Sequence, residues 1–323
     1  MNTTSAPNPR KRQVCKRPYR VFLAALSVLF IAHQSFAQEC KQKTEGWNPP
    51  SAGPIVTWTA PVACKGSLVV QPFFFYNYIR GIFNAESHYK HFKDGGKMSE
   101  FQEMLFVQYG LADRVEISAQ AVYQQNLARQ DGTSVTASGF NDTYLFLRYC
   151  VLDETKWLPT TTAVFQLKFP TGKYQKADPA KLGTDIITAY TGGGAYEEGC
   201  GLNFTKKIKP FMFHADFLFG FPNPATVDGV NTQYGSYLNY DGAIEYFFWD
   251  HFNLLAEASG LVQGDTRESG YLTPSSASAY LNLIAGLGWS DSNIQMLVAY
   301  QRTVAGTNTD VIDSLVATFV YTF

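Results

Sequence analysis

The last thirteen residues of the chain, 311–323, alternate between two kinds of side chain. One set is apolar and mostly large, and the other is smaller and more hydroxylated. The first set is Leu315, Ala317, Phe319, Tyr321 and Phe323; the second is Ser314, Val316, Thr318, Val320 and Thr322. A period of two is the period of a β-strand. A terminal strand with one aromatic, apolar face predicts the closing strand of a transmembrane barrel, with an edge strand of a soluble β-sandwich as the alternative.

Strand-like runs of this kind recur along the chain from residue 66 to its end. They lie at residues 67–80, 99–111, 115–126, 140–152, 160–169, 184–204, 211–221, 237–249, 252–263, 279–289, 294–303 and 311–323. Most are close to the ~9–11 residues that a tilted membrane-spanning strand needs. The sixth run is loosened by three consecutive glycines at positions 192–194.

The connections between these runs alternate between short and long. The short ones contain Asp, Asn and Lys, and the long ones contain Gly, Ser, Thr and Lys. This asymmetry is typical of barrels with short periplasmic turns and long outer loops. The sequence therefore predicts an all-β fold: a transmembrane, antiparallel, up-and-down β-barrel of about twelve strands over residues 66–323. Merging or splitting one hairpin would give ten or fourteen strands.

Successive side chains of a strand point to opposite faces of the sheet. If the apolar set of alternate residues in each strand faces lipid, the other set, which we call the opposite parity, lines the lumen. The polar and charged side chains of that parity are Glu116, Gln120, Asp142, Arg148, Gln166, Lys168, His214, Asp216, Asp241, Glu245 and Glu257. Charges in the spanning zone are costly unless they are paired or wet. They predict either a mixed-charge constriction that screens solutes or ion pairs that brace the wall. In the first case, Arg148→Ala should change ion selectivity.

The first 37 residues have the pattern of a secretory signal peptide. Six basic residues precede an apolar run at residues 21–32, and Ser35-Phe36-Ala37 forms a small-x-small cleavage site. The segment carries six of the 26 Lys and Arg residues and none of the 27 acidic ones, so the mature chain keeps 20 basic residues and has a formal charge of −7. That charge argues against a nucleic-acid partner.

Residues 38–65 are polar, rich in proline and without a period, so we expect a periplasmic N-terminal arm. A plug inside the barrel mouth is the alternative. In an oxidising compartment, Cys40 and Cys64 are candidates for a disulfide. Cys150 and Cys200 fall on the fourth and sixth runs, roughly 9–10 Å apart if the fifth run lies between them, so we expect no disulfide between them.

Three motifs resemble one family of outer-membrane proteins, described as the "MetA-pathway of phenol degradation" family. Tyr-Gly-Leu-Ala-Asp-Arg-Val-Glu-Ile at residues 109–117 looks like its recurrent hairpin. Gly139 to Asp142 followed by Leu-Phe-Leu-Arg-Tyr at residues 145–149 is similar to its next strand, although Asn141-Asp142 departs from the usual Gly-Asp. Phe-Pro-Thr-Gly at residues 169–172 matches its Pro-Thr-Gly. The resemblance implies a barrel that passes aromatic or other small hydrophobic compounds.

The chain end also resembles a known signal. A last strand that finishes with Tyr321 and Phe323 is similar to the assembly signal of bacterial outer-membrane proteins. Aromatic residues make up 15% of the chain, and no second run of eighteen apolar residues exists, which excludes helical spans. We therefore expect the bacterial outer membrane as the location. The expected partners are the lipid bilayer, lipopolysaccharide, the barrel-assembly machinery and a small-molecule solute.

The sequence does not favour an enzyme. Outer-membrane acyl hydrolases place a Ser and a His on one strand face, but Ser87 and His88 are adjacent in a loop, and His214 has no Ser two residues away. No cluster has metal-ligand spacing, so we expect no cofactor and no metal. The predicted function is an outer-membrane channel for passive passage of small solutes. The alternative is a surface-exposed adhesive or interaction barrel with a closed lumen.

Overall fold

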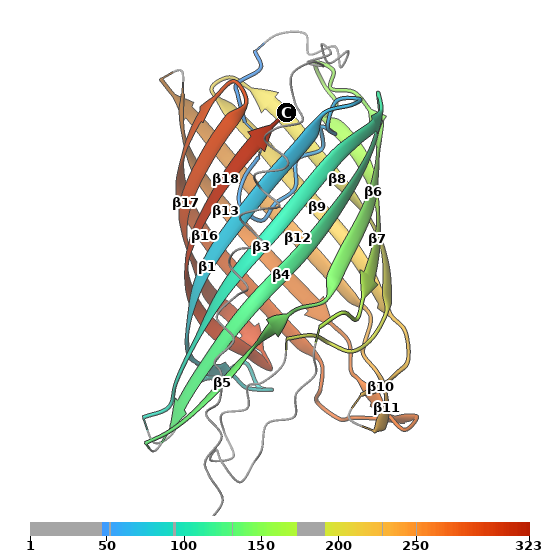
Figure 1. The fold of residues 1–323 in the computed structure, drawn as a ribbon, viewed down its shortest axis with the longest axis vertical. Coiled ribbons are helices and arrows are strands. Elements are labelled where there is room, and N and C mark those ends of the chain that lie inside the picture. Colours follow the sequence, from blue (N-terminus) through green and yellow to red (C-terminus); the bar gives the residue numbers. More distant parts are fainter. Residues whose placement is uncertain are drawn as a thin grey trace, which may run out of the picture. The chain divides into compact units, whose positions relative to one another are not determined.

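Twelve antiparallel strands form one closed sheet in the part of the chain that the computed structural model describes (Figure 1). The model describes residues 47–51, 53–92, 95–130, 132–172, 191–227, 229–249 and 251–323. The barrel strands are β1 (Leu68–Phe83), β3 (Lys97–Ala112), β4 (Val115–Gln130), β6 (Thr143–Leu152), β7 (Thr160–Phe169), β8 (Glu197–Ile208), β9 (Phe211–Pro222), β12 (Tyr237–Phe248), β13 (Phe252–Gln263), β16 (Ser278–Asp291), β17 (Ile294–Thr307) and β18 (Thr309–Thr322). The predicted fold class is confirmed. The predicted signal peptide, residues 1–37, lies outside the described residues.

The first and last strands close the barrel. β18 pairs with β1 from Val69↔Thr322 to Phe83↔Thr309, and the Phe323 amide donates a hydrogen bond to the Leu68 carbonyl oxygen at 2.8 Å. No edge of the twelve-stranded sheet is therefore left open, which is what a hydrocarbon environment requires. Both ends of the barrel sequence lie at the end with the short hairpin turns. We call this end the turn end and the opposite one the loop end.

The loop end carries six short additional strands. They are β2 (Tyr89–His91), β5 (Thr133–Phe140), β10 (Ala225–Val227), β11 (Val230–Gln233), β14 (Arg267–Glu268) and β15 (Tyr271–Leu272). β5 pairs with residues 123–130 of β4, which lie toward the loop end. Residues 115–120 of β4, toward the turn end, pair with β6. The strands β10, β11, β14 and β15 make a small sheet of their own. The long predicted loops thus contain structure that their composition did not indicate.

Two predicted boundaries were wrong. The sixth run was expected over 184–204, but β8 begins only at Glu197, and residues 191–196 belong to no strand. Three glycines offer no side chains to pack, and the Gly193 amide donates to the Asp142 side chain instead of to a neighbouring strand. The last loop-end connection was expected to be long. It is the single residue Asn308, whose positive φ of 46° suits a tight turn.

The two faces of the sheet differ as the alternation predicts. On β18, Leu315 and Phe319 are exposed, whereas Val316 and Val320 on the other parity are 1% exposed. On β9, the five phenylalanines of one parity all face outward. The outward face is not free of charge: Arg80, Glu103, Arg302 and Asp313 lie on it, each in the loop-end half of its strand. The apolar belt therefore lies toward the turn end.

The lumen is not empty at the turn end. Ile55 packs with Phe73, Leu255, Leu297 and Val316 in a buried cluster, so the N-terminal segment contributes to the core. The prediction of a periplasmic arm over residues 38–65 is therefore corrected. The described part of this segment lies inside the barrel mouth, as the alternative of a plug expected. Within the described residues, no helix is long and apolar enough to cross a membrane.

Candidate solute pathway in the barrel lumen

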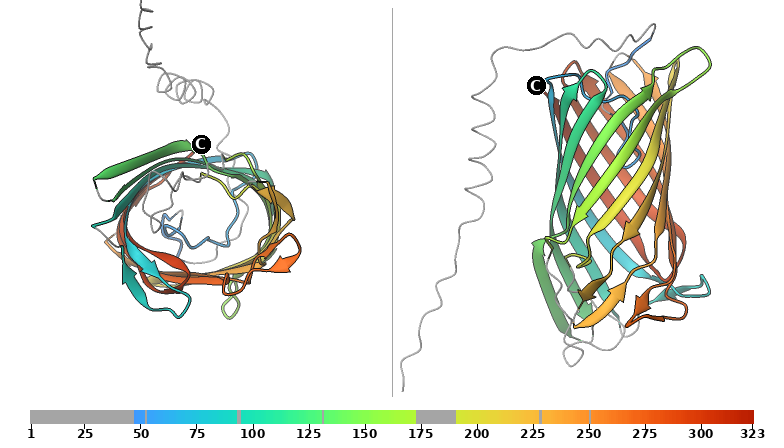
Figure 2. Two further views of the ribbon diagram at one scale, coloured as in Figure 1. Left: turned by 90° about the horizontal axis from the view of Figure 1, so that it is seen from below. Right: turned by 90° about the vertical axis from the view of Figure 1, so that its right-hand side faces the viewer.

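Residues 47–51 and 53–65, which we call the N-terminal plug, run through the inside of the ring of strands (Figure 2). Hydrogen bonds hold the plug to inward-facing side chains from β4 around to β17. The Ala60 amide donates to Thr205 Oγ1 at 2.8 Å, and the Ala60 carbonyl oxygen accepts from Thr162. On the opposite side of the lumen, Ser290 donates to the Pro50 carbonyl oxygen. The plug thus spans the lumen from wall to wall.

Glu257 on β13 is the main anchor of the plug. Its carboxylate accepts the amides of Ile55 at 2.6 Å, Val56 at 3.0 Å and Thr57 at 3.0 Å, and also the Thr57 hydroxyl at 3.0 Å. Glu257 is only 4% exposed. A buried carboxylate needs several donors to offset its lost hydration, and consecutive backbone amides supply them here.

Three further acidic side chains bind the plug in the same way. Asp216 on β9 accepts the Trp58 amide at 2.7 Å, and Glu116 on β4 accepts the Ala63 amide at 2.7 Å. Glu245 on β12 accepts the Ser51 hydroxyl at 3.1 and 3.0 Å. These acids were predicted to screen solutes or to brace the wall through ion pairs. Glu116 and Glu245 do pair with side chains of the wall, Arg148 and His214, and they bind the plug as well.

Close approach of the plug also explains a glycine of the Tyr-Gly-Leu motif. A Cβ atom on Gly110 would lie 1.9 Å from the Cys64 carbonyl oxygen. The Gly66 amide donates to the Gly110 carbonyl oxygen at 2.8 Å, and the Gly110 amide donates to Ser67 at 3.1 Å. Any side chain at this position would push the end of the plug away from β3.

Cys64 itself is disulfide-bonded. Cys40 lies outside the described residues, so its predicted pairing with Cys64 stays a prediction. Cys150 and Cys200 are free thiols. Cys150 is buried on the inner face of β6, Cys200 is exposed on the outer face of β8, and β7 runs between these strands.

The basic side chains predicted for the lumen are held in buried pairs. Arg148 Nη1 lies 2.9 Å from Glu116 Oε1, with the two side chains 1% and 0% exposed. Arg148 also donates to the Thr59 carbonyl oxygen, and its guanidinium lies 5.3 Å from the centre of the Trp58 ring. Arg148 therefore lies against the plug, and its expected role is structural rather than selective.

His214 on β9 connects the two neighbouring strands, β8 and β12. Its Nε2 lies 3.0 Å from Glu245 Oε1, and its Nδ1 lies 3.0 Å from Thr205 Oγ1. Asn253 on β13 also donates to Glu245. This network links the four strands β8, β9, β12 and β13 to the plug through Ser51 and Ala60.

A second charged cluster lies near the loop end. Lys168 on β7 lies 3.5 Å from Asp142, the residue just before β6, and forms a closer pair with Glu197 on β8. Asp142 also accepts the amides of Gly172 at 3.1 Å and Gly193 at 2.8 Å. The segment with the three glycines is thereby drawn inward over this end of the wall.

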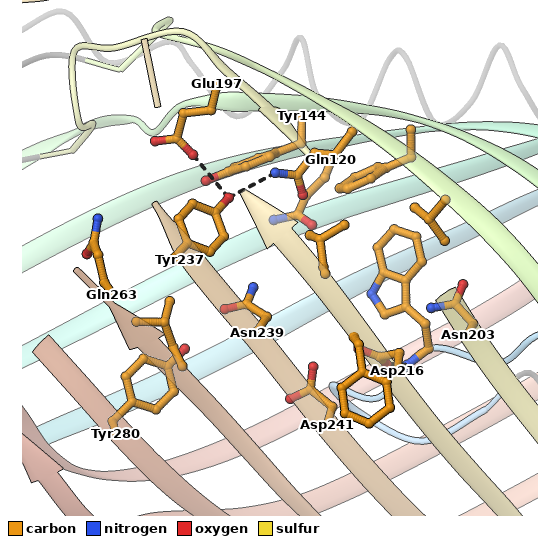
Figure 3. Close-up of a pocket in the computed structure, with 17 residues that line it drawn as sticks. Gln120, Tyr144, Glu197, Asn203, Asp216, Tyr237, Asn239, Asp241, Gln263 and Tyr280 are labelled. Atoms are coloured by element: carbon orange, nitrogen blue, oxygen red, sulfur yellow. Dashed lines mark hydrogen bonds between the residues drawn. The ribbon is translucent and has the colours of Figure 1, made fainter. Parts of the chain in front are cut away.

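Between the plug and this cluster lies a cavity of about 440 Å³ (Figure 3). Trp58 of the plug lines one part of it, and Glu197 lines another. Its polar lining is Gln120, Tyr144, Gln166, Glu197, Asn203, Asp216, Tyr237, Asn239, Asp241, Gln263 and Tyr280. The cavity has the size of a small-molecule site.

Hydrogen bonds order one side of the cavity. The Tyr237 hydroxyl donates to Glu197 Oε2 at 3.1 Å and accepts from Gln166 Nε2 at 3.0 Å. On the other side, Asp216 and Asp241 are direct cross-strand neighbours of β9 and β12. The carbonyl oxygens of the Asn203 and Asn239 side chains are buried without a hydrogen-bond partner.

All eleven predicted lumen residues lie on the inner face, but in three groups. Those at the cavity are Gln120, Gln166, Asp216 and Asp241; those around the plug are Glu116, Arg148, His214, Glu245 and Glu257; those near the loop end are Asp142 and Lys168. The prediction missed Tyr144, Tyr237 and Asn239, although each shares the parity of a predicted neighbour. It missed Glu197 because the sixth run was misplaced.

The candidate catalytic side chains do not meet. The Ser87 hydroxyl lies 2.6 Å from the Thr307 hydroxyl, and the two ring nitrogens of His214 contact Thr205 and Glu245. Within the described residues, no group of three His, Cys, Asp or Glu side chains could hold a metal ion.

Solved structures with the same fold are outer-membrane barrels. An outer membrane channel from Pseudomonas putida F1 is 14% identical, with a TM-score of 0.67 over 84% of this chain and 100% of that one. The β domain of the Bordetella autotransporter BrkA is 10% identical, with a TM-score of 0.50 over 80% of this chain and 100% of that one. No family model and no curated protein matches the sequence. The likeness shows the fold, which the chain shares with bacterial outer-membrane channels.

Proposed function

We propose that this protein is a channel of the bacterial outer membrane through which small solutes pass passively, with the N-terminal plug as its barrier. The observation that carries the proposal is the cavity of about 440 Å³ above the plug. The side chains of an eight-stranded barrel fill its interior. A barrel with more strands has a wider interior, which is either plugged or left as a channel. Here the plug occupies the turn-end half, and the described residues beyond it enclose a polar cavity.

The location follows the same argument. A closed sheet with aromatic side chains outward and polar side chains inward suits a bilayer, and Tyr321 and Phe323 stand at the end of the closing strand as a signal for the barrel-assembly machinery. The lipid bilayer and lipopolysaccharide would surround the apolar belt. Membership of the "MetA-pathway of phenol degradation" family, with its aromatic solutes, belongs to this proposal as well. The pathway needs no enzymatic step and no cofactor.

The plug gives the proposal a test. Glu257→Gln replaces one acceptor oxygen by an NH₂ group, which cannot accept the amides of residues 55–57. In planar bilayers, the chain from residue 38 should give brief conductance steps, and Glu257→Gln should lengthen the open periods. Asp291→Asn, in the exposed β16–β17 turn, removes a charge away from the lumen and should behave like the wild type.

The contrary results are distinct. If correctly folded wild type and Glu257→Gln are both silent, the channel proposal fails, and a surface role with a closed lumen takes its place. If both conduct identically, the plug is not the barrier.

A further inference from the structure

The cavity above the plug carries an excess of hydrogen-bond acceptors. Among the residues that line it are three carboxylates, and none is Lys, Arg or His. Glu197 is paired with Lys168, but Asp216 and Asp241 face each other across β9 and β12. Their side chains are hydrogen-bonded to each other, so one of the two carboxyls holds a proton, and a cationic ligand would take the place of that proton. Asp216 receives one amide, that of Trp58, and no cationic side chain lines the cavity beside it.

A second observation points to the same place. Asn203 is 4% exposed, lines the cavity, and its side-chain oxygen has no hydrogen-bond partner. The side-chain oxygen of Asn239, also in the lining, is likewise without a partner. Buried polar atoms are normally paired, and leaving one unpaired costs about 1–3 kcal/mol. A donor supplied by a ligand would satisfy these oxygens.

Aromatic side chains form a large part of the rest of the lining. Trp58, Phe146, Tyr144, Tyr237 and Tyr280 all contribute to the cavity wall. Figure 3 shows Tyr237, Asn239 and Asp241 side by side on one strand, with Tyr280 and Asn203 on either side of them. Aromatic faces attract cations and stack on flat rings.

We infer that this cavity is a binding site for a small organic ammonium ion, with the ammonium group at Asp216 and Asp241 and the apolar part against the aromatic wall. The three N–H donors of a primary ammonium group suit the carboxyl groups of Asp216 and Asp241 and the side-chain oxygen of Asn203, which is the cross-strand neighbour of Asp216. This inference rests on the proposed channel function and narrows its solute class: a positively charged aromatic compound is preferred over a neutral or negatively charged one.

The test uses three probes of nearly equal shape and different charge: benzylammonium, benzyl alcohol and benzoate. Binding to the chain from residue 38, folded in detergent micelles, is measured by isothermal titration calorimetry. Benzylammonium should bind at least about tenfold more tightly than benzyl alcohol, because hydrogen bonds to charged groups are the stronger ones. Benzoate should not bind measurably.

Variants locate the site. Asp241→Asn leaves the plug contact of Asp216 intact and should weaken benzylammonium binding about tenfold, with little effect on benzyl alcohol. Asp291→Asn, in the exposed turn, should change neither. Heat-modifiable gel mobility shows that each variant is folded.

Equal binding of the three probes, or benzylammonium binding that survives both Asp241→Asn and Asp216→Asn, would overturn the inference. Conductance separates this failure from failure of the proposed function. A protein that conducts without preferring benzylammonium remains a channel, whereas one that binds benzylammonium and never conducts is a binding protein.

Discussion

The two halves of the lumen use the same residue types in different ways. In the turn-end half, Glu116 and Glu257 accept two or more donors each, from plug amides and neighbouring side chains. In the cavity half, Asp241 faces another carboxylate, and the side-chain oxygens of Asn203 and Asn239 have no partner. Buried polar groups that are fully bonded hold a structure together, whereas unsatisfied ones invite a ligand.

The comparison distinguishes polar side chains that hold the structure together from those that would contact a solute, although both groups contain the same residue types. Glu116 and Glu257 anchor the plug, Asp241 contacts the solute, and Asp216 does both, because it accepts the Trp58 amide and also lines the cavity. Substitutions in the first half should therefore change stability, and substitutions in the second half should change solute binding.

The largest effect is expected for Arg148→Ala. This change leaves Glu116 buried beside an empty space and removes the donor to the Thr59 carbonyl oxygen. Breaking a buried ion pair by removing one partner costs roughly 3–5 kcal/mol. Urea unfolding in micelles, followed by heat-modifiable mobility, measures the loss.

The matched control is Arg114→Ala at the β3–β4 turn. Arg114 pairs with Asp153, and both side chains are more than 40% exposed. An exposed pair of this kind contributes less than about 1 kcal/mol. Equal losses for Arg148→Ala and Arg114→Ala would mean that the lumen around Glu116 is open to water.

A smaller effect distinguishes two asparagines of the inner face. Asn253 donates to buried Glu245 in the turn-end half, so Asn253→Ala should cost about 1–3 kcal/mol of unfolding free energy. The side-chain oxygens of both asparagines lack a partner, so the donation to Glu245 is what distinguishes them; Asn203→Ala should stay within about 0.5 kcal/mol and should weaken benzylammonium binding instead. The same unfolding assay measures both. If Asn203→Ala is the more destabilising of the two, the division of the lumen into two halves is wrong.

The alternation of side chains was enough to predict the barrel and its two faces. Only one parity of a strand can face lipid, so Phe217 and Leu315 had to point outward and Glu116 and Glu245 inward. The same reasoning placed the eleven polar residues on the inner face. The start of β8 was predicted wrongly because three consecutive glycines give no alternation of side chains.

The occupation of the lumen could not be read from the sequence. The plug binds through backbone amides, which every residue except proline possesses, so residues 55–57 give no signal of their contact with Glu257. The cavity depends on where the plug stops. Sequence parity shows that Asp241 faces inward, but not that Asp216 is its direct neighbour across the strands.

Thiol accessibility tests the central claim: an apolar outer wall surrounds a lumen that the plug fills at one end and that holds a polar cavity at the other. In a background with Cys150→Ala and Cys200→Ala, single cysteines replace Asn239 in the cavity, Thr205 beneath the plug or Phe217 on the outer face. A charged, membrane-impermeant methanethiosulfonate is added to protein in lipid vesicles. We predict fast modification at position 239 and little at positions 205 and 217. Modification at position 205 as fast as at 239, or faster modification at 217 than at 239, would contradict the account.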